Sequence, residues 1–183
     1  WDVFNGESDL SLLKTNQNGD SLWSQTFIFD SDTNNYVQTK SRSVQQTTDG
    51  GYIITGWTQS GGTSNWEIFL LKTNQNGDSL WSQTWDNVAR YESHSVQQTN
   101  DGGYIIGGSR DSNHYLAKTN SYGDSLWSRE FQEDSVNKKI DVIFNLNDNG
   151  LLLLGGVKSF SPFSFNNIDR RIKVDSLGFC EGQ

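Results

Sequence analysis

Aromatic and ionisable side chains interrupt an otherwise repetitive and polar sequence, and these are the residues whose chemistry could serve a ligand. The residues unique to the expected loops, outside the repeated pattern, are Trp57, Trp66, Asp86, Arg90, Tyr91, Glu92, His94, Arg110, Asp111 and His114. Trp57 and Trp66 bracket a loop of Gly, Ser and Thr, where two indole rings can offer a stacking platform for sugar rings or can simply pack within the fold. The candidate ligand-binding residues are Trp57, Trp66, Tyr91, Glu92, His94 and His114.

Acid chemistry has one candidate pair, Asp86 and Glu92, which fall in one expected loop. Glycosidases need two carboxyl groups at a defined distance, and sequence spacing in a loop does not set that distance. The single cysteine, Cys180, is read as a free thiol or as half of a bridge to another segment. Neither His94 nor His114 forms a recognisable Cys–His pattern with it, so no catalytic residue is assigned.

Asparagine, glycine and aspartate recur in short turns that resemble calcium loops only loosely. The first turn holds Asn16, Asn18 and Asp20, and the second holds Asn74, Asn76 and Asp78. The glycine is misplaced for an EF-hand loop and the distant glutamate is missing. Asn-Gly supplies the positive φ that a tight hairpin needs, so these segments are predicted to be hairpin turns. No metal site and no cofactor are expected.

The elements that must position these residues are set by two alternating repeats. The stretch LLKTNQNGDSLWSQT occupies residues 12–26, returns unchanged at 70–84, and returns in altered form at 116–128 as LAKTNSYGDSLWS. The stretch SVQQTTDGGY at 43–52 returns at 95–104. Lys14, Lys72, Lys118 and Lys173 mark the period, with separations of 58, 46 and 55 residues. Periods near 40–50 residues with several strands each are typical of propeller blades.

The repeats predict an all-β fold, a β-propeller of four-stranded antiparallel blades. We expect a partial blade at 1–29, blades at 43–85 and 95–131, and a diverged incomplete blade at 139–179. Residues 30–42 are expected to be a polar loop, and about thirteen strands are expected in total. Thirteen strands make little more than three blades, so we expect the chain to be part of a larger propeller.

Composition excludes several classes of protein. Hydrophobic residues make up 33% of the 183 residues and the formal net charge is −8. A nucleic-acid-binding protein needs a basic patch, which is not apparent in this sequence. There is no apolar run of about 18 residues, so no membrane insertion is expected.

Residues that recur in every unit are predicted to be structural. Trp23, Trp81 and Trp127 are equivalent and bring large apolar area to blades with few aliphatic residues. Tyr52 and Tyr104 are expected to pack between blades. The recurring lysines are expected either to pair with a carboxylate on a neighbouring strand or to lie along the tryptophans.

The paired signatures SVQQTTDGGYIITGWT and FLLKTNQNGDSLWSQTW resemble the repeats of secreted β-propeller proteins of the Bacteroidetes type. The resemblance covers about residues 9–178 and fades after residue 139, where DNGLLLLGG and IKVDSLG remain. It implies an extracellular or cell-surface location and export by type IX secretion, although the sorting domain is not in this sequence. It brings no catalytic residue and no cofactor residue with it.

We therefore expect a non-catalytic, adhesin-like binding or scaffold module that takes a protein or a glycan at its variable loops. The alternative is an accessory module that binds or degrades polysaccharide through loop aromatics and acids. Incomplete blades at both ends leave unpaired strand edges, which are expected to pair with further blades of the same chain or with another copy.

Overall fold

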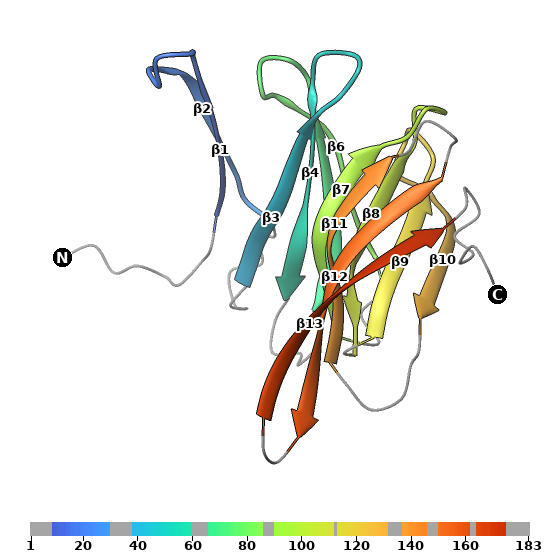
Figure 1. The fold of residues 1–183 in the computed structure, drawn as a ribbon. Helices are drawn as coiled ribbons and strands as arrows, with labels where there is room; N and C mark the ends of the chain where they lie inside the picture. Colours follow the sequence, from blue (N-terminus) through green and yellow to red (C-terminus); the bar gives the residue numbers. More distant parts are fainter. Residues whose placement is uncertain are drawn as a thin grey trace.

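The computed structural model describes residues 9–29, 38–59, 66–85, 90–111, 113–131, 137–145, 150–161 and 164–174. In these residues every regular element is a β-strand, as Figure 1 shows, and no helix occurs that could cross a membrane. The all-β prediction is confirmed. The number of strands, thirteen in the described ranges, also agrees with the sequence.

The strands form four separate antiparallel sheets, each a meander of neighbours in sequence. The first is a hairpin of β1 (Leu10–Thr15) and β2 (Ser21–Phe27). The second sheet contains β3 (Gln38–Gln46), β4 (Tyr52–Gln59), β5 (Glu67–Thr73) and β6 (Ser79–Trp85). The third sheet contains β7 (Tyr91–Gln98), β8 (Tyr104–Arg110), β9 (Asn113–Thr119) and β10 (Ser125–Phe131). The fourth sheet contains β11 (Asn137–Asn145), β12 (Leu151–Ser161) and β13 (Ser164–Val174).

Hairpin turns close the strands as the sequence predicts. Gly19, Gly50, Gly77, Gly102 and Gly123 all have φ between +81° and +88°, a region that costs other residues strain. In the first turn the Asn16 side-chain oxygen accepts hydrogen bonds from the Asn18 and Asp20 amides, at 2.9 and 3.0 Å. Its side-chain nitrogen donates to the Asp20 carboxylate at 2.9 Å. The groups that resembled calcium ligands are therefore hydrogen-bonded to one another.

The sheets stack face to face in sequence order, and the apolar core lies between them. Adjacent residues on one strand serve opposite sides: Ile54 packs toward the β1–β2 hairpin, while Ile53 packs toward the third sheet. The same alternation places Ile106 against the second sheet and Ile105 against the fourth. Both faces of the central strands of the second and third sheets are therefore buried, which explains the continuous apolar runs of β4 and β5.

The first two junctions between consecutive sheets use the same pair of aromatic residues. Trp23 of the hairpin meets Tyr52 of the second sheet with ring centroids 5.8 Å apart. Trp81 meets Tyr104 of the third sheet at 5.9 Å. The prediction that these tyrosines pack between repeats is confirmed. Burial raises the pKa of Tyr104 to about 12, and the Asp49 charge adds to the shift.

Buried polar contacts also join the second and third sheets. Thr55 donates its hydroxyl hydrogen to Ser93 Oγ at 2.8 Å, and Ser93 donates to the Gly56 carbonyl at 2.6 Å. The Val96 amide donates to Ser43 Oγ, and the Ile143 amide makes the equivalent bond to Ser95 Oγ. The first strands of the second, third and fourth sheets are therefore joined by equivalent serines, Ser43 and Ser95, which helps to fix how each sheet packs on the next.

Two predicted loops are partly strand. The polar loop expected at 30–42 is wrong from Gln38 onward, because β3 begins there; its polar residues find partners, as Thr39 and Thr58 do through their hydroxyls at 3.0 Å. Tyr91, Glu92 and His94, taken as loop residues, lie in β7, and Arg110 and His114 lie in β8 and β9. Asp86 and Cys180 lie outside the described residues.

The described sheets form a row that does not close into a ring (Figure 1). What the structure establishes is an all-β protein of stacked antiparallel sheets, two of them complete with four strands.

Candidate functional site

The two ends of the stacked sheets differ in chemistry. The Asn-Gly and Asp-Gly-Gly turns of the hairpin and of the second sheet lie together at the top of Figure 1. The opposite end, which we call the variable end, carries the last residues of β4 and β8 and the first of β7 and β9. Register brings Tyr91 opposite Arg110, and Arg110 opposite Asn113. Trp66 reaches Arg90 through an isolated bridge, in which the Tyr91 amide donates to the Trp66 carbonyl.

Trp57 and Trp66 come together at this end, but not as an open platform. Their rings stack at 4.3 Å between centroids with 7° between planes. The Arg90 guanidinium lies 3.5 Å above the Trp66 ring, and Lys40 Nζ lies 5.3 Å from the Trp57 centroid. Trp57 is only 2% exposed. A sugar ring therefore reaches the face of Trp66 only by displacing Arg90, whose attraction to the ring is about 0.5–1 kcal/mol at an exposed site.

Glu92 and His94 lie on one strand beside Arg90. Glu92 is 3.8 Å from His94 Nε2 and 3.8 Å from the Arg90 guanidinium, distances at the outer limit of an ion pair. His94 is the extra residue of a β-bulge, since Ser93 and Ser95 pair with the adjacent Gly108 and Gly107. Arg42 and Asp141 occupy the same bulge in β3 and β11. The bulge is part of the repeat, and only its side chain varies.

His114 does not lie on the surface. It is 2% exposed in β9, at the position that Leu10 and Ile68 hold in the earlier repeats. Both of those residues are core residues, so His114 occupies a core position. Of the six predicted site residues, Trp57, Trp66, Tyr91, Glu92 and His94 share the region around the start of β7. His114 lies on β9 and is as deeply buried as Trp57 and Tyr91.

The recurring lysines show both of the expected contacts: some pair with a carboxylate, and one lies near a tryptophan. Lys72 Nζ lies 2.9 Å from the Asp49 carboxylate and Lys118 Nζ lies 2.9 Å from that of Asp101, both in Asp-Gly-Gly turns. Lys14 instead lies about 6 Å from the rings of Trp23 and Tyr52. Lys72 and Lys118 are buried and bind the carboxylates of these turns, whereas Lys14 is partly exposed and lies near aromatic rings.

Hydrogen bonds lower the pKa of both turn carboxyls to about 2. For Asp49 the largest contribution is the bond from Thr47, followed by that from Lys72. For Asp101 desolvation is largest and raises the pKa, but bonds from Thr99, Lys118 and Gly103 together outweigh it. Across the described residues, no group of three or more His, Cys, Asp and Glu side chains could hold a metal ion.

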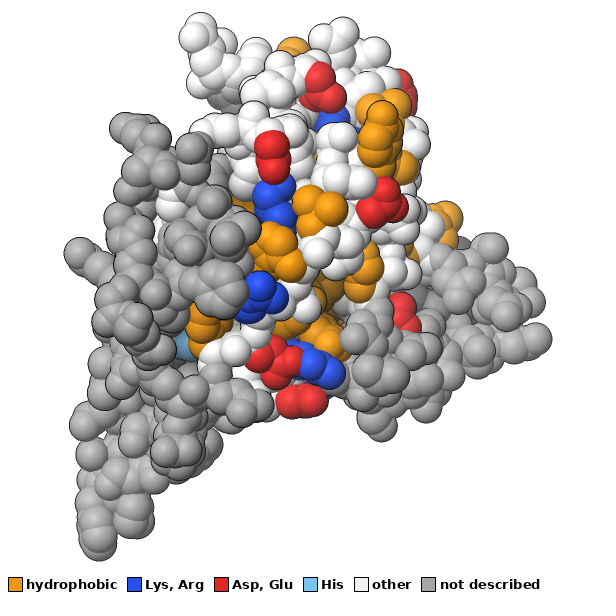
Figure 2. Space-filling view, turned by 90° about the vertical axis from the view of Figure 1, so that its right-hand side faces the viewer, with side chains coloured by type: hydrophobic (Ala, Val, Ile, Leu, Met, Phe, Trp, Pro, Cys, Tyr) orange, Lys and Arg blue, Asp and Glu red, His pale blue; other side chains and the backbone are white. Residues whose placement is uncertain are grey.

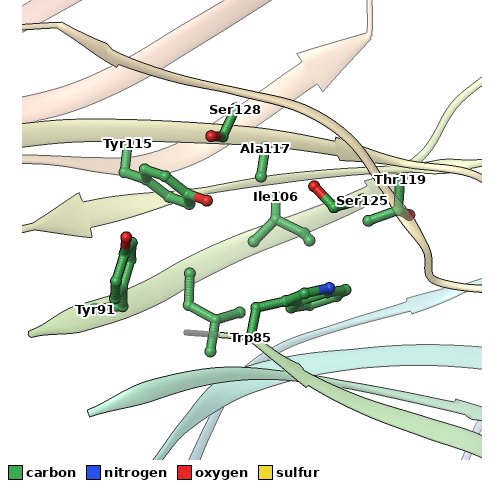
Figure 3. Close-up of a pocket in the computed structure, with 9 residues that line it drawn as sticks. Trp85, Tyr91, Ile106, Tyr115, Ala117, Thr119, Ser125 and Ser128 are labelled. Atoms are coloured by element: carbon green, nitrogen blue, oxygen red, sulfur yellow. The ribbon is translucent and has the colours of Figure 1, made fainter. Parts of the chain in front are cut away.

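A cavity of about 270 Å³ lies between the second and third sheets, and the sequence analysis missed it. Its lining residues are Ile68, Trp85, Tyr91, Ile106, Tyr115, Ala117, Thr119, Ser125 and Ser128. Figure 3 shows the Tyr115 ring projecting into this space, with Trp85 on the opposite side and the Ser128 hydroxyl near its upper edge. Tyr91 and Tyr115 meet edge to face at 5.1 Å. We call this space the aromatic pocket.

The aromatic pocket exists because the third repeat departs from the second at two positions on one face. Ala117 stands where the second sheet has Leu71, and Tyr115 stands where it has Phe69. Leu71 and Phe69 fill the space between the hairpin and the second sheet. The signal was present in the sequence: LLKT of the identical copies becomes LAKT in the third. A letter-by-letter comparison of the repeats identifies Ala117 as the position where a large side chain is lost.

Both charge signs are interspersed on the face shown in Figure 2, with hydrophobic side chains between them. That face is therefore not a basic patch.

No protein-family model matches this chain, and no curated protein matches it. Its class therefore rests on its own repeats and geometry: an all-β protein of stacked repeat sheets with a variable end and an aromatic pocket.

Proposed function

We propose that this protein is a non-catalytic binding and scaffold module, built as a segment of a β-propeller and acting outside the cell or at its surface. The observation that carries the proposal is the division between repeated and varied residues. Turns, lysine–aspartate pairs and tryptophan–tyrosine contacts recur, whereas residues around the start of β7 do not. In repeat proteins the invariant part holds the fold and the varied part selects a partner.

Exposure supports the presence of further sheets. Leu13 is 58% exposed, although its equivalent Leu71 is 2% exposed beneath the hairpin. Val44 is 53% exposed, although its equivalent Val96 is 2% exposed. We propose that further strands of the same repeat, from another part of the chain or from a second copy, cover both residues. Leu13 faces away from the second sheet and would lie beneath another sheet, whereas Val44 faces the layer of the hairpin and would lie beneath strands added to the hairpin. Light scattering on this chain tests it: self-association that Leu13→Asp abolishes is expected, and a monomer unaffected by that substitution contradicts it.

The partner is proposed to be a protein or a glycan bound at the variable end. The test is an array of immobilised glycans together with capture of cell-surface proteins, read with the unaltered chain and with Arg90→Ala, which uncovers Trp66. A change in partner binding on uncovering Trp66 is expected. Identical profiles for both chains would place the partner elsewhere. The extracellular location and type IX export rest on the repeat resemblance, and fractionation of the source cell tests them.

A second function, binding or degradation of polysaccharide, is favoured by the aromatic pocket. Degradation would require an acid pair, and Glu92 is already engaged near His94 and Arg90. Release of reducing ends from polysaccharides, measured with Glu92→Gln as the matched variant, separates this function from binding alone. Release that the substitution abolishes would replace the non-catalytic proposal.

A further inference from the structure

We infer that the aromatic pocket binds one neutral saccharide ring. This inference rests on the proposed function, since it assigns a ligand class to a binding module. The pocket's volume lies just below the range of about 300–1,000 Å³ typical of sites for drug-sized ligands, which suits a single ring. No Asp, Glu, Lys, Arg or His is among its described lining residues, so the ligand it suits carries no charge.

The lining has two kinds of surface, as a sugar ring has. Trp85 and Tyr115 present aromatic surface to the C–H side of a ring, with Ile106 and Ala117 at the base. Hydroxyl groups come from Ser125 and Ser128, each able to donate one hydrogen bond and accept two, and from Thr119, whose hydroxyl donates to the Asn120 carbonyl at 3.0 Å and can still accept. A ligand that carries hydroxyl groups can form hydrogen bonds with these side chains, which a purely apolar ligand cannot do.

Access is provided from the side of β10. Ser125 and Ser128 are exposed, while Tyr91, Ile106 and Thr119 are buried. The two serines therefore lie at the entrance, and Ile106 and Tyr91 lie deeper, together with the Thr119 hydroxyl. A ring that enters past the serines buries its C–H face and keeps its outer hydroxyls near Ser125, Ser128 and solvent.

The neighbouring junction supplies the variants for a test. Ala117→Leu and Tyr115→Phe convert the pocket toward the filled arrangement that Leu71 and Phe69 make, so both side chains are ones the repeat already accommodates. Leu126→Ala is the control, because Leu126 lies on the same strand as the two serines, is exposed, and does not line the pocket.

The probes are methyl glycosides of glucose, galactose, mannose, fucose and N-acetylglucosamine, with phenol as an apolar ring of similar width. Binding is measured by calorimetry and by the NMR shifts of the Ser125 and Ser128 amides. We expect at least one glycoside to bind in the millimolar range, ordinary for so small a ligand. Ala117→Leu should weaken it by at least about 10-fold and Tyr115→Phe by a smaller factor, and Leu126→Ala should leave it unchanged.

Three results would overturn the inference: no glycoside binds, phenol binds while every glycoside fails, or Ala117→Leu leaves affinity unchanged. The last result, with binding on the glycan array intact, would retain the binding module and reject this pocket. Absence of any partner on the array and in the capture experiment would reject the proposed function as well. If Ala117→Leu does not fold, Tyr115→Phe and the amide shifts test binding in the aromatic pocket. Shifts confined to residues outside the pocket would contradict the inference.

Discussion

The junction between the β1–β2 hairpin and the second sheet, and the junction between the second and third sheets, are built on the same frame. Each has a tryptophan from the last strand of one sheet, a tyrosine from the next sheet, and a turn glycine over the indole. A Cβ added to Gly77 would lie 2.8 Å from the Trp23 ring, and one added to Gly123 would lie 2.8 Å from that of Trp81. Only hydrogen fits at either place.

What differs is the filling. The hairpin junction is closed by Leu71 and by Phe69, whose ring lies 4.6 Å from that of Phe29. The junction between the second and third sheets has Ala117 and Tyr115 instead, and the aromatic pocket remains. On the third sheet, the site differs from the filled junction by the loss of three carbon atoms and the gain of one hydroxyl, and on the facing strand Trp85 stands where the hairpin has Phe27. The tryptophan–tyrosine–glycine frame stays intact. The comparison predicts that the two junctions respond differently to substitutions of one type.

The largest expected effect on stability is that of Leu71→Ala. This substitution gives the hairpin junction the alanine that the junction between the second and third sheets has at Ala117. Leu71 is fully packed, so truncation should lower the free energy of unfolding by about 3–4 kcal/mol. Urea denaturation measures it. Leu80→Ala, at an exposed position of the same sheet, is the control and should change stability by less than about 0.5 kcal/mol. Equal effects would mean that Leu71 does not fill the junction.

Trp81→Ala should have the next largest effect and lower the free energy of unfolding by about 2–3 kcal/mol. Its ring is partly exposed, which lowers the cost below that of a fully buried tryptophan. Trp66→Ala is the comparison: it removes one stacked pair and one cation contact, worth about 1 kcal/mol together. Thermal melts of both variants give the order. A greater loss for Trp66 would place the main anchor at the variable end instead of at the junction.

The sequence predicted the strands, turns and inter-sheet tyrosines because each leaves a local pattern. Identical turns such as NQNGD determine their own hydrogen bonds, and Asn16 and Asn74 make the same ones. Strand starts at Gln38 and Tyr91 escaped prediction, since their polar residues are stabilised by neighbours distant in sequence. The stacking of Trp57 on Trp66 and the burial of His114 likewise depend on register across the sheet.

The aromatic pocket was harder to predict for a different reason. A cavity remains where the side chains of two facing sheets leave space unfilled. An alanine such as Ala117 does not by itself indicate such a space. Its meaning appears only when it is aligned with Leu71 and placed opposite Trp85. The hydroxyl of Tyr115 is likewise informative only against Phe69.

Gly123→Ala tests the frame at the pocket junction. The new methyl group meets the Trp81 ring at a backbone φ of +88°, so it carries both strain and a clash. Gly102→Ala has φ +81° and open space around it, so it carries strain alone. The free energy of unfolding should fall by about 2 kcal/mol for Gly123→Ala and by about 1 kcal/mol for Gly102→Ala. Denaturation curves that coincide would show that the indole yields freely and that the glycine contact is not part of the frame.

The smallest expected effect is the loss of stability in acid. It should occur at the turns in which a lysine pairs with Asp49 or Asp101. Asp49 and Asp101 have pKa values lowered to about 2 from an ordinary 3.8. A carboxyl whose pKa falls on folding stabilises the fold above the unfolded pKa, and this stability is lost as pH falls through the folded pKa. The contribution should therefore be complete above about pH 5 and be lost between about pH 5 and pH 2. Both carboxylates are more than half exposed, so the loss should be modest.

Hydrogen exchange can resolve that loss turn by turn. The Gly51 and Gly103 amides donate to the Asp49 and Asp101 carboxylates at 2.9 and 3.0 Å, so their protection factors should fall as these groups take up protons. The Asp20 amide donates to the neutral Asn16 side chain at 3.0 Å, and its protection should not follow that titration. Asp49→Asn should remove the pH dependence at Gly51 and leave it at Gly103. Equal losses of protection at all three amides would mean that acid destabilises all the sheets together. The lysine–aspartate pairs would then not be the groups through which acid acts.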